Sequence, residues 1–354
     1  MESLYKQYSE LEKSYYEINI NSIQLFKPDM PEKSCRYFIN RHMEKGNKRP
    51  VMFMPFKEQY KNKGKHEHTV SLFLLGLLLQ KGDNEADKLL ETHLKELMDT
   101  GIWYDFKYTW FLGCLLHDIA SCIEKENVNR PKYSNSVFAH KPKRHGVVLT
   151  RFSEETVNNY LKYRGGYDHG IIGGDLVFDR LCKTFKRRTK DNDWNSNPRF
   201  NIKKGGNYLL YCEEHLDHFA YIADAIICHN IWMSYDESTN KKYEQHGLEK
   251  LIITKQGDKL NLQKYPLQFI LCLLDTIEPV KRFEKLDSKT VLENVFIDIA
   301  DGTIKIGCNS IIKQQPEFHK WFGNISELKE WMNVNVLECK REDDICYIEI
   351  EYDR

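Results

Sequence analysis

Imidazole and carboxylate side chains interrupt five of the most apolar stretches of this sequence. These residues are His68, the adjacent pair His117-Asp118, His169, His229 and Asp275. Burying such a group among Leu, Ile and Phe costs on the order of several kcal/mol unless another group pairs with it. Five apolar stretches that each carry one or two of these residues predict a shared partner. A metal ion is the simplest partner, because imidazole nitrogens and carboxylate oxygens are metal ligands.

Some of these residues also have a purely structural interpretation. The pair His117-Asp118, within LLHDIA, can hydrogen-bond inside a core, and Asp275 can cap a helix that ends just ahead of a proline. His66 competes with His68 for the first position. We favour His68, because it directly adjoins the apolar run TVSLFLLGLLL.

His169 and His229 have structural alternatives as well. His169 can be the first residue of a helix that is capped by Asp168, and His229 can be a core histidine satisfied by its neighbours. If both alternatives hold, the site binds one metal ion instead of two.

The order His … His-Asp … His … His … Asp resembles that of the HD-domain superfamily of metal-dependent phosphohydrolases, in its six-ligand, two-metal branches. The resemblance covers residues 50–285, and its most specific part is the His-Asp pair in LLHDIA with the other members in order on apolar helices. It implies a mainly α fold, an HD-domain helical bundle. The late alternating segments predict a small C-terminal α+β segment.

The resemblance also implies the metal ligands. One ion would be held by His68, His117, Asp118 and Asp275. Asp118 would also bridge to a second ion, held by His169 and His229. His117 and Asp118 would lie at the catalytic centre. Such mixed ligands suit one or two ions of Mn, Fe, Co, Ni or Zn, whereas Mg²⁺ is less suited because it would keep many waters.

The implied reaction is hydrolysis of a phosphate ester or anhydride, of a nucleotide by preference, by a metal-activated water. Two alternatives to hydrolysis remain. The superfamily also contains iron oxygenases with the same ligand types, which accounts for the first of them. The first is a di-iron oxygenase, and the second is a non-catalytic ligand sensor that contains the metal.

Cationic residues near these stretches are candidates for binding substrate phosphates. Arg282 follows Asp275 by seven residues and His218 precedes His229 by eleven, so each returns close to one helical face. Two basic segments, 130–145 and 186–208, contain Lys141, Lys143, Arg144, His145, Arg187, Arg188, Lys203 and Lys204. Aromatic side chains in these segments can stack on a base or instead fix their own loops: Tyr133, Phe138, Trp194 and Phe200. Alternatively, the Lys and Arg side chains of these two segments form only a solvated surface and bind no substrate.

The composition and the N-terminal sequence indicate a soluble protein of the cytoplasm. Lys+Arg and Asp+Glu balance at 52 each, so the global charge favours neither nucleic acid nor a membrane surface. The ten Cys occur without a C-x-x-C pair, which favours reduced thiols. The N-terminus lacks the apolar core of a signal peptide, and the run LFLLGLLL is too short to span a bilayer. We expect a small phosphorylated substrate, no membrane partner and no nucleic-acid partner; homo-oligomer formation is left open.

The apolar pattern divides the 354 residues into three parts. Residues 1–49 are expected to form a helix and an irregular lead-in, 50–286 the metal-binding domain, and 287–354 the small α+β segment. In the first two parts, one apolar helix is expected to begin at His68. Further helices are expected at about 1–26, 84–99, 107–125, 153–164, 168–186, 213–233 and 264–286. Residues 186–208 are expected to form a long loop. The segment VFIDIADGTIKIG alternates around Asp301-Gly302, which predicts a β-hairpin.

Overall fold

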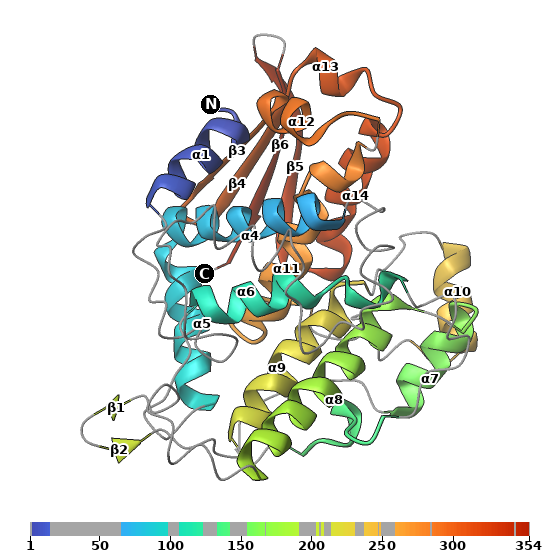
Figure 1. The fold of residues 1–354 in the computed structure, drawn as a ribbon. Coiled ribbons are helices and arrows are strands. Elements are labelled where there is room, and N and C mark those ends of the chain that lie inside the picture. The colour runs from blue at the N-terminus through green and yellow to red at the C-terminus, as the bar shows by residue number, and fades with distance from the viewer. Residues whose placement is uncertain are drawn as a thin grey trace.

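The described part of the chain is mainly helical, with a four-stranded antiparallel sheet formed by C-terminal residues (Figure 1). This computed structural model describes residues 2–14, 65–97, 106–122, 133–141, 154–166, 168–190, 203–204, 207–208, 214–230, 237–246, 248, 259–283, 285–342 and 345–353. The expectation of a mainly α fold with a small C-terminal α+β segment is confirmed, whereas membership of the HD-domain superfamily stays a prediction.

Five helices carry the candidate ligands or end directly before them. They are α4 (Lys65–Gly82), α6 (Phe106–Leu116), α8 (His169–Lys190), α9 (Glu214–Cys228) and α11 (Pro266–Ile277). α4 is buried on nearly every side, because it packs against helices α6 and α11 and against strand β3. Three further helices lie around this group: α5 (Asn84–Leu97), α7 (Glu154–Tyr163) and α10 (Glu237–Gln245).

Two of these helices end earlier than the sequence pattern predicts. α6 ends at Leu116 and α9 at Cys228, whereas the pattern predicts continuation to about 125 and 233. His117-Asp118 and His229 therefore lie in turns directly after helix ends. After the first of these turns the chain continues as the 3-10 helix η5 (Ile119–Cys122).

α11 is also shorter than predicted, because it ends at Ile277 and not near 286. Glu278 precedes Pro279, and a proline disfavours helical backbone in the residue before it. Glu278 accordingly has an extended ψ of 121°. The chain then turns through the 3-10 helix η9 (Val280–Arg282), which leads it back along the end of α11.

Glycine allows α8 and α9 to pack closely. A Cβ at Gly174 would lie 2.6 Å from the carbonyl oxygen of Ala223 and 2.5 Å from Cγ1 of Ile227, both on α9. The helices run antiparallel, so this approach brings His169, the first residue of α8, beside the turn that carries His229.

The sheet has the strand order β3-β4-β6-β5, with every neighbouring pair antiparallel. Its strands are β3 (Val295–Ala300), β4 (Thr303–Cys308), β5 (Val334–Glu342) and β6 (Ile345–Tyr352), and the accompanying helices are α12 (Ser288–Asn294), α13 (Ser310–Lys313) and α14 (Phe318–Trp331). Asp301 and Gly302 join β3 to β4 with φ values of 48° and 79°. Two successive positive φ values are typical of a type I′ turn, and the predicted hairpin is confirmed.

The sheet and the helices share one hydrophobic core, which also includes the N-terminal helix α1 (Leu4–Ser14). Asp83, buried between α4 and α5, connects the two parts. Its Oδ1 accepts the backbone N–H of Glu85 (3.0 Å) and Ala86 (3.3 Å), and its Oδ2 accepts the N–H of Gly302 (3.1 Å) and the hydroxyl of Tyr352 (2.8 Å). A single carboxylate thus ties the helices to the β3–β4 turn and to the end of β6.

Two other expectations need correction or restriction. The segment 186–208 is not a loop throughout, because α8 continues to Lys190 and β1 (Lys203–Lys204) pairs with β2 (Asn207–Tyr208). The rest of that segment, and residues 15–26 of the expected first helix, lie outside the described residues.

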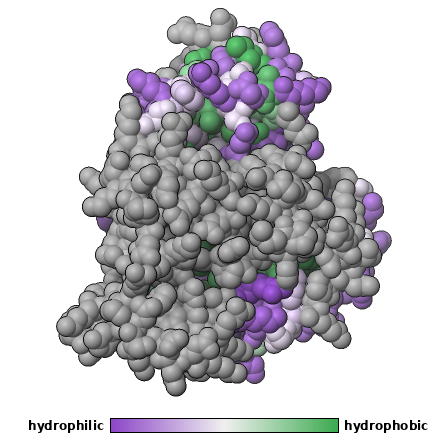
Figure 2. Space-filling view, in the orientation of Figure 1, coloured by the Kyte–Doolittle hydropathy of each residue, from purple (hydrophilic) through white to green (hydrophobic). Residues whose placement is uncertain are grey.

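Within the described ranges, no helix is long and apolar enough to cross a membrane. The large hydrophobic side chains exposed there are Tyr5, Ile311 and Leu337. In Figure 2, the described surface at the end of the molecule where α13 lies mixes hydrophilic and apolar residues. Five of the described cysteines carry free thiols, as expected: Cys114, Cys182, Cys228, Cys272 and Cys308. Cys346 on β6 is disulfide-bonded, which corrects the expectation that all the thiols are reduced.

Candidate metal centre

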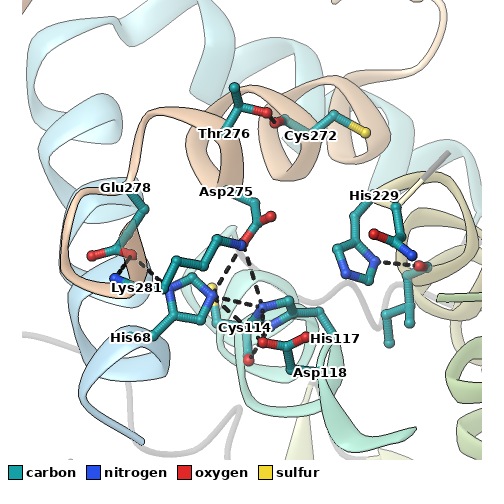
Figure 3. Close-up of polar contacts among 12 residues, drawn as sticks. His68, Cys114, His117, Asp118, His229, Cys272, Asp275, Thr276, Glu278 and Lys281 are labelled. Carbon is teal, nitrogen blue, oxygen red and sulfur yellow. Dashed lines mark hydrogen bonds and ion pairs between the residues drawn. The ribbon is translucent and has the colours of Figure 1, made fainter. Parts of the chain in front are cut away.

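Five of the six predicted ligands come together in the interior, at or directly after helix ends (Figure 3). The sixth, His169, is partly exposed and lies beside Asp118. His68 lies in the first turn of α4 and His169 opens α8; Asp275 lies in the last turn of α11. His117, Asp118 and His229 follow the last residues of α6 and α9. The first and last of these residues, His68 and Asp275, are more than 200 positions apart, so tertiary packing brings the cluster together.

The first group consists of His68, His117 and Asp275. Nε2 of His68 lies 3.1 Å from Oδ1 of Asp275 and 3.0 Å from Nε2 of His117. Nε2 of His117 lies 3.6 Å from the same Asp275 oxygen. All three side chains are buried, and their donor atoms lie close enough together to hold a metal ion.

The second group consists of His117, Asp118 and His229. Oδ2 of Asp118 lies 3.4 Å from Nε2 of His117, and the His117 and His229 rings meet edge to face with their centroids 5.1 Å apart. The other Asp118 oxygen, Oδ1, lies 3.3 Å from Nε2 of His169. Oδ2 of Asp118 also lies 3.7 Å from Nε2 of His68, in the first group. Asp118 therefore faces both groups, as a bridging carboxylate would. The sequence had placed His117 in the first group only.

Protein acceptors set the orientation of three of the imidazoles. Nδ1 of His117 lies 2.8 Å from the carbonyl oxygen of Cys114, and Nδ1 of His229 lies 2.5 Å from that of Ile226. The last carbonyls of a helix have no partner within the helix, so a histidine that directly follows the helix can donate to them. Nδ1 of His68 lies 2.6 Å from Oε2 of Glu278.

In the neutral form of each ring these acceptors hold the proton on Nδ1, which leaves the lone pair on Nε2. Those Nε2 atoms are the ones that point into the cluster. Bonding of the outer nitrogen to a carbonyl or carboxylate is the usual arrangement for metal-ligating histidine.

His169 has a different environment. The amide nitrogen of Asn230 donates to Oδ2 of Asp168 at 2.8 Å and lies 3.4 Å from Nδ1 of His169. The hydrogen bonds therefore place the His169 proton on Nε2, where it can be donated to Asp118. Asp168 also caps α8 by accepting the N–H of Ile171 at 3.0 Å, as the structural alternative for this segment supposed. A ligand role for His169 stays a prediction.

The electrostatics of the cluster favour a bound cation. Burial raises the pKa of Asp275, but the Lys281 ammonium and interactions with His117 and His68 outweigh burial and hold that pKa well below its usual range. Burial lowers the pKa of His117, but Asp118 and Asp275 outweigh it and raise this pKa. Burial, together with the positive charges of His117 and His169, lowers the pKa of His229 to about 3, so this ring is neutral at physiological pH.

Glu278 and Lys281 belong to the cluster, and the sequence pattern did not identify them. Glu278 is fully buried against His68, and Lys281 forms an ion pair with Oδ1 of Asp275. Both residues lie in DTIEPVKRF, within six positions of Asp275. The proline in this segment was the available signal, because a helix break returns the following residues towards the helix end.

The candidate substrate residues have varied positions. Arg282 donates through one guanidinium nitrogen to the carbonyl oxygens of Asp275 (3.0 Å) and Thr276 (3.3 Å), so it is bonded to the end of α11. Arg282 therefore contacts the backbone of a predicted ligand, Asp275. His218 is buried on α9, with Nε2 3.1 Å from the hydroxyl of Thr109. Their substrate roles stay predictions.

The first basic segment is described over residues 133–141, where Lys141 is exposed. Tyr133 and Phe138 are partly buried against the core, which supports the interpretation that they fix their own loop. Asp175 of α8 holds this stretch by accepting the N–H of Val137 at 2.9 Å. Lys143, Arg144, His145, Trp194 and Phe200 lie outside the described residues, as do the side chains of Arg187, Arg188, Lys203 and Lys204.

Comparisons with known proteins give no family assignment. No protein-family model matches the chain, and neither curated proteins nor solved structures gave a match. The resemblance to the HD-domain superfamily therefore stays a prediction, and any inference about function rests on the geometry of the cluster.

Proposed function

We propose that this chain is a metal-dependent phosphohydrolase that cleaves a phosphate ester or anhydride of a nucleotide. One observation carries the proposal. Three imidazole Nε2 atoms, each with its Nδ1 next to a protein acceptor, converge with two carboxylates in a buried cluster.

The donor set fits a transition-metal ion. Nε2 of His68 and Nε2 of His117 lie 3.0 Å apart, and if both carry lone pairs they repel each other unless a cation lies between them and the Asp275 carboxylate. His68, His117 and Asp275 would hold one ion together with Asp118, whose Oδ2 lies 3.7 Å from Nε2 of His68. Asp118 would bridge to a second ion held with His229, and His169 lies next to this carboxylate. Imidazole with carboxylate suits Mn, Fe, Co, Ni or Zn.

Divalent ions in such a set lower the pKa of a water molecule towards neutrality and stabilise negative charge on a phosphoryl group. The protein's own groups would fix the site for that chemistry. Glu278 and the carbonyls of Cys114 and Ile226 hold the rings of His68, His117 and His229, so little reorganisation is needed when a substrate binds.

Charge supports an anionic substrate. The three carboxylates of the cluster (Asp118, Asp275 and Glu278) do not neutralise two divalent ions, and the Lys281 ammonium adds further positive charge. A loaded site of this kind is net positive and little exposed to water, where electrostatic attraction to a phosphoryl group is strong.

The test is a chromatographic assay of nucleotide products over mono-, tri- and cyclic nucleotides, because opening of a cyclic diester releases no free phosphate. The protein is loaded in turn with Mn²⁺, Fe²⁺, Co²⁺, Ni²⁺ and Zn²⁺. We expect turnover of at least one nucleotide class by the wild type, loss of turnover in Asp118→Ala, and normal turnover in Asp298→Asn, which changes an exposed carboxylate on β3. Absence of turnover with every loaded metal would overturn the proposal. Oxygen consumption by iron-loaded protein in that case would indicate the oxygenase alternative, and metal binding without either reaction would indicate the sensor.

A further inference from the structure

A lysine outside the predicted ligand set reaches into the candidate metal centre. Nζ of Lys281 forms an ion pair with Oδ1 of Asp275, the oxygen that lies 3.1 Å from Nε2 of His68 and 3.6 Å from Nε2 of His117 (Figure 3). The ammonium therefore shares one carboxylate oxygen with the donor atoms of the first group.

The backbone fixes the position of this lysine. After α11 ends, the N–H groups of Val280 and Lys281 donate to the carboxylate of Glu278 at 2.8 and 3.2 Å. The same carboxylate holds His68 at 2.6 Å. A single buried residue, Glu278, thus positions both a ligand histidine and the turn from which Lys281 extends. The next cation, Arg282, is bonded to carbonyls at the end of α11 and does not share this environment.

Lys281 is also more exposed to solvent than most of the cluster. Its side chain is 18% exposed and that of His169 is 20% exposed, whereas the side chains of His68, His117, Asp118 and Asp275 are exposed by 5% or less. Of these six side chains, Lys281 and His169 are therefore the most accessible to a ligand from solvent.

Charge decides what the ammonium does in the loaded protein. A divalent ion bound to Oδ1 of Asp275 repels a second cation on the same oxygen, and the flexible stem of a lysine lets the ammonium move away. A phosphoryl group at the ion places anionic oxygens within reach of that ammonium. We propose that Lys281 binds a phosphoryl oxygen of the substrate; this inference rests on the proposed function and names the residue that recognises the phosphate.

Inorganic phosphate is the probe, titrated calorimetrically into Mn²⁺-loaded protein whose metal content is verified by elemental analysis. Lys281→Met keeps the apolar stem and removes the charge. We expect phosphate affinity to fall about 10- to 100-fold, the range for loss of a charge-assisted hydrogen bond. Lys281→Arg keeps the charge and should retain most of the affinity. Lys285→Met removes an exposed charge four residues away and should leave the affinity unchanged.

The outcomes separate this inference from the proposed function. Wild-type protein that binds no Mn²⁺, or binds Mn²⁺ but no phosphate, overturns the proposed function and the inference with it. Phosphate binding by wild type and Lys281→Met with equal affinity overturns the inference alone. An equal loss in Lys285→Met also overturns it, because the effect would then be one of general charge. If Lys281→Met does not fold, as judged by its thermal melt, Lys281→Gln gives the same comparison.

Discussion

Replacing Glu278 by glutamine removes the charge of a fully buried carboxylate while keeping its shape. Glu278 accepts from Nδ1 of His68 (2.6 Å), from the N–H of Val280 (2.8 Å) and from the N–H of Lys281 (3.2 Å). An amide has one oxygen, so either orientation of the glutamine turns its NH₂ group towards at least one of these donors. A hydrogen bond to a charged acceptor contributes about 1.5–3 kcal/mol. We expect the unfolding free energy of metal-free protein to fall by about 2 kcal/mol at pH 7.

The same substitution should weaken metal binding. His68 loses the charged acceptor that holds its proton on Nδ1, and loss of such an outer partner typically lowers metal affinity about 10- to 100-fold. Calorimetric titration of metal-stripped wild type and Glu278→Gln with Mn²⁺ measures this change. Affinities within threefold of each other would refute the role of Glu278 in orienting His68.

The pH dependence gives the sign of the charge effect. Burial raises the pKa of Glu278, but interactions with His68 and Ser71 outweigh it and hold that pKa below its usual range. A carboxyl with a lowered pKa stabilises the fold above its unfolded pKa of about 4.3, and this stabilisation is lost as pH falls through the folded pKa. The stability difference between wild type and Glu278→Gln, from urea unfolding of metal-free protein, should therefore shrink below about pH 4. A constant difference from pH 7 to pH 3 would contradict the reasoning.

Three further predictions concern packing and metal loading. Gly174→Ala places a Cβ 2.6 Å from the Ala223 carbonyl oxygen and should lower the unfolding free energy by about 1–3 kcal/mol. In Gly113→Ala the new Cβ would meet nothing within 4 Å, so the unfolding free energy should rise by up to about 1 kcal/mol. Urea denaturation of both variants tests this contrast. Asp83→Ala leaves four donors without their acceptor and should cost about 3 kcal/mol, equally in metal-free and metal-loaded protein; an effect seen only in loaded protein would argue against a purely structural role. A chelator should lower the melting temperature of loaded wild type but not that of Asp118→Ala, and equal shifts would place the stabilising ion elsewhere.

The clustering of these imidazoles and carboxylates could be predicted from the sequence, because a polar group in an apolar stretch requires a partner wherever the stretch packs. Their role as metal ligands stays a prediction. The hairpin at Asp301-Gly302 could be predicted for a local reason, since its turn type depends on two adjacent residues. The ends of the helices were harder to predict from the sequence. His117 and His229 continue apolar patterns, yet each lies in the turn after a helix, where its ring bonds to a carbonyl of the last turn.

Glu278 and Lys281 could not be found from periodicity. They follow the end of α11, and their side chains reach the cluster because Pro279 ends the helix and the chain returns along it. The hydrogen bonds of Asp83 that connect the helices to the sheet could not be predicted either, because in the sequence Asp83 looks like an ordinary helix N-cap residue. Its partners Gly302 and Tyr352 are more than 200 positions away.

Anomalous diffraction from crystals of Mn²⁺- or Zn²⁺-loaded protein tests the central claim most directly. We predict an anomalous peak about 2.0–2.3 Å from Nε2 of His68 and His117 and from Oδ1 of Asp275, with a second peak beside Asp118 and His229 if two ions bind. Crystals of Asp118→Ala should lack both peaks. Loaded wild-type crystals with no peak in the cluster, or with peaks only at surface residues, would contradict the assignment of this cluster as a metal centre.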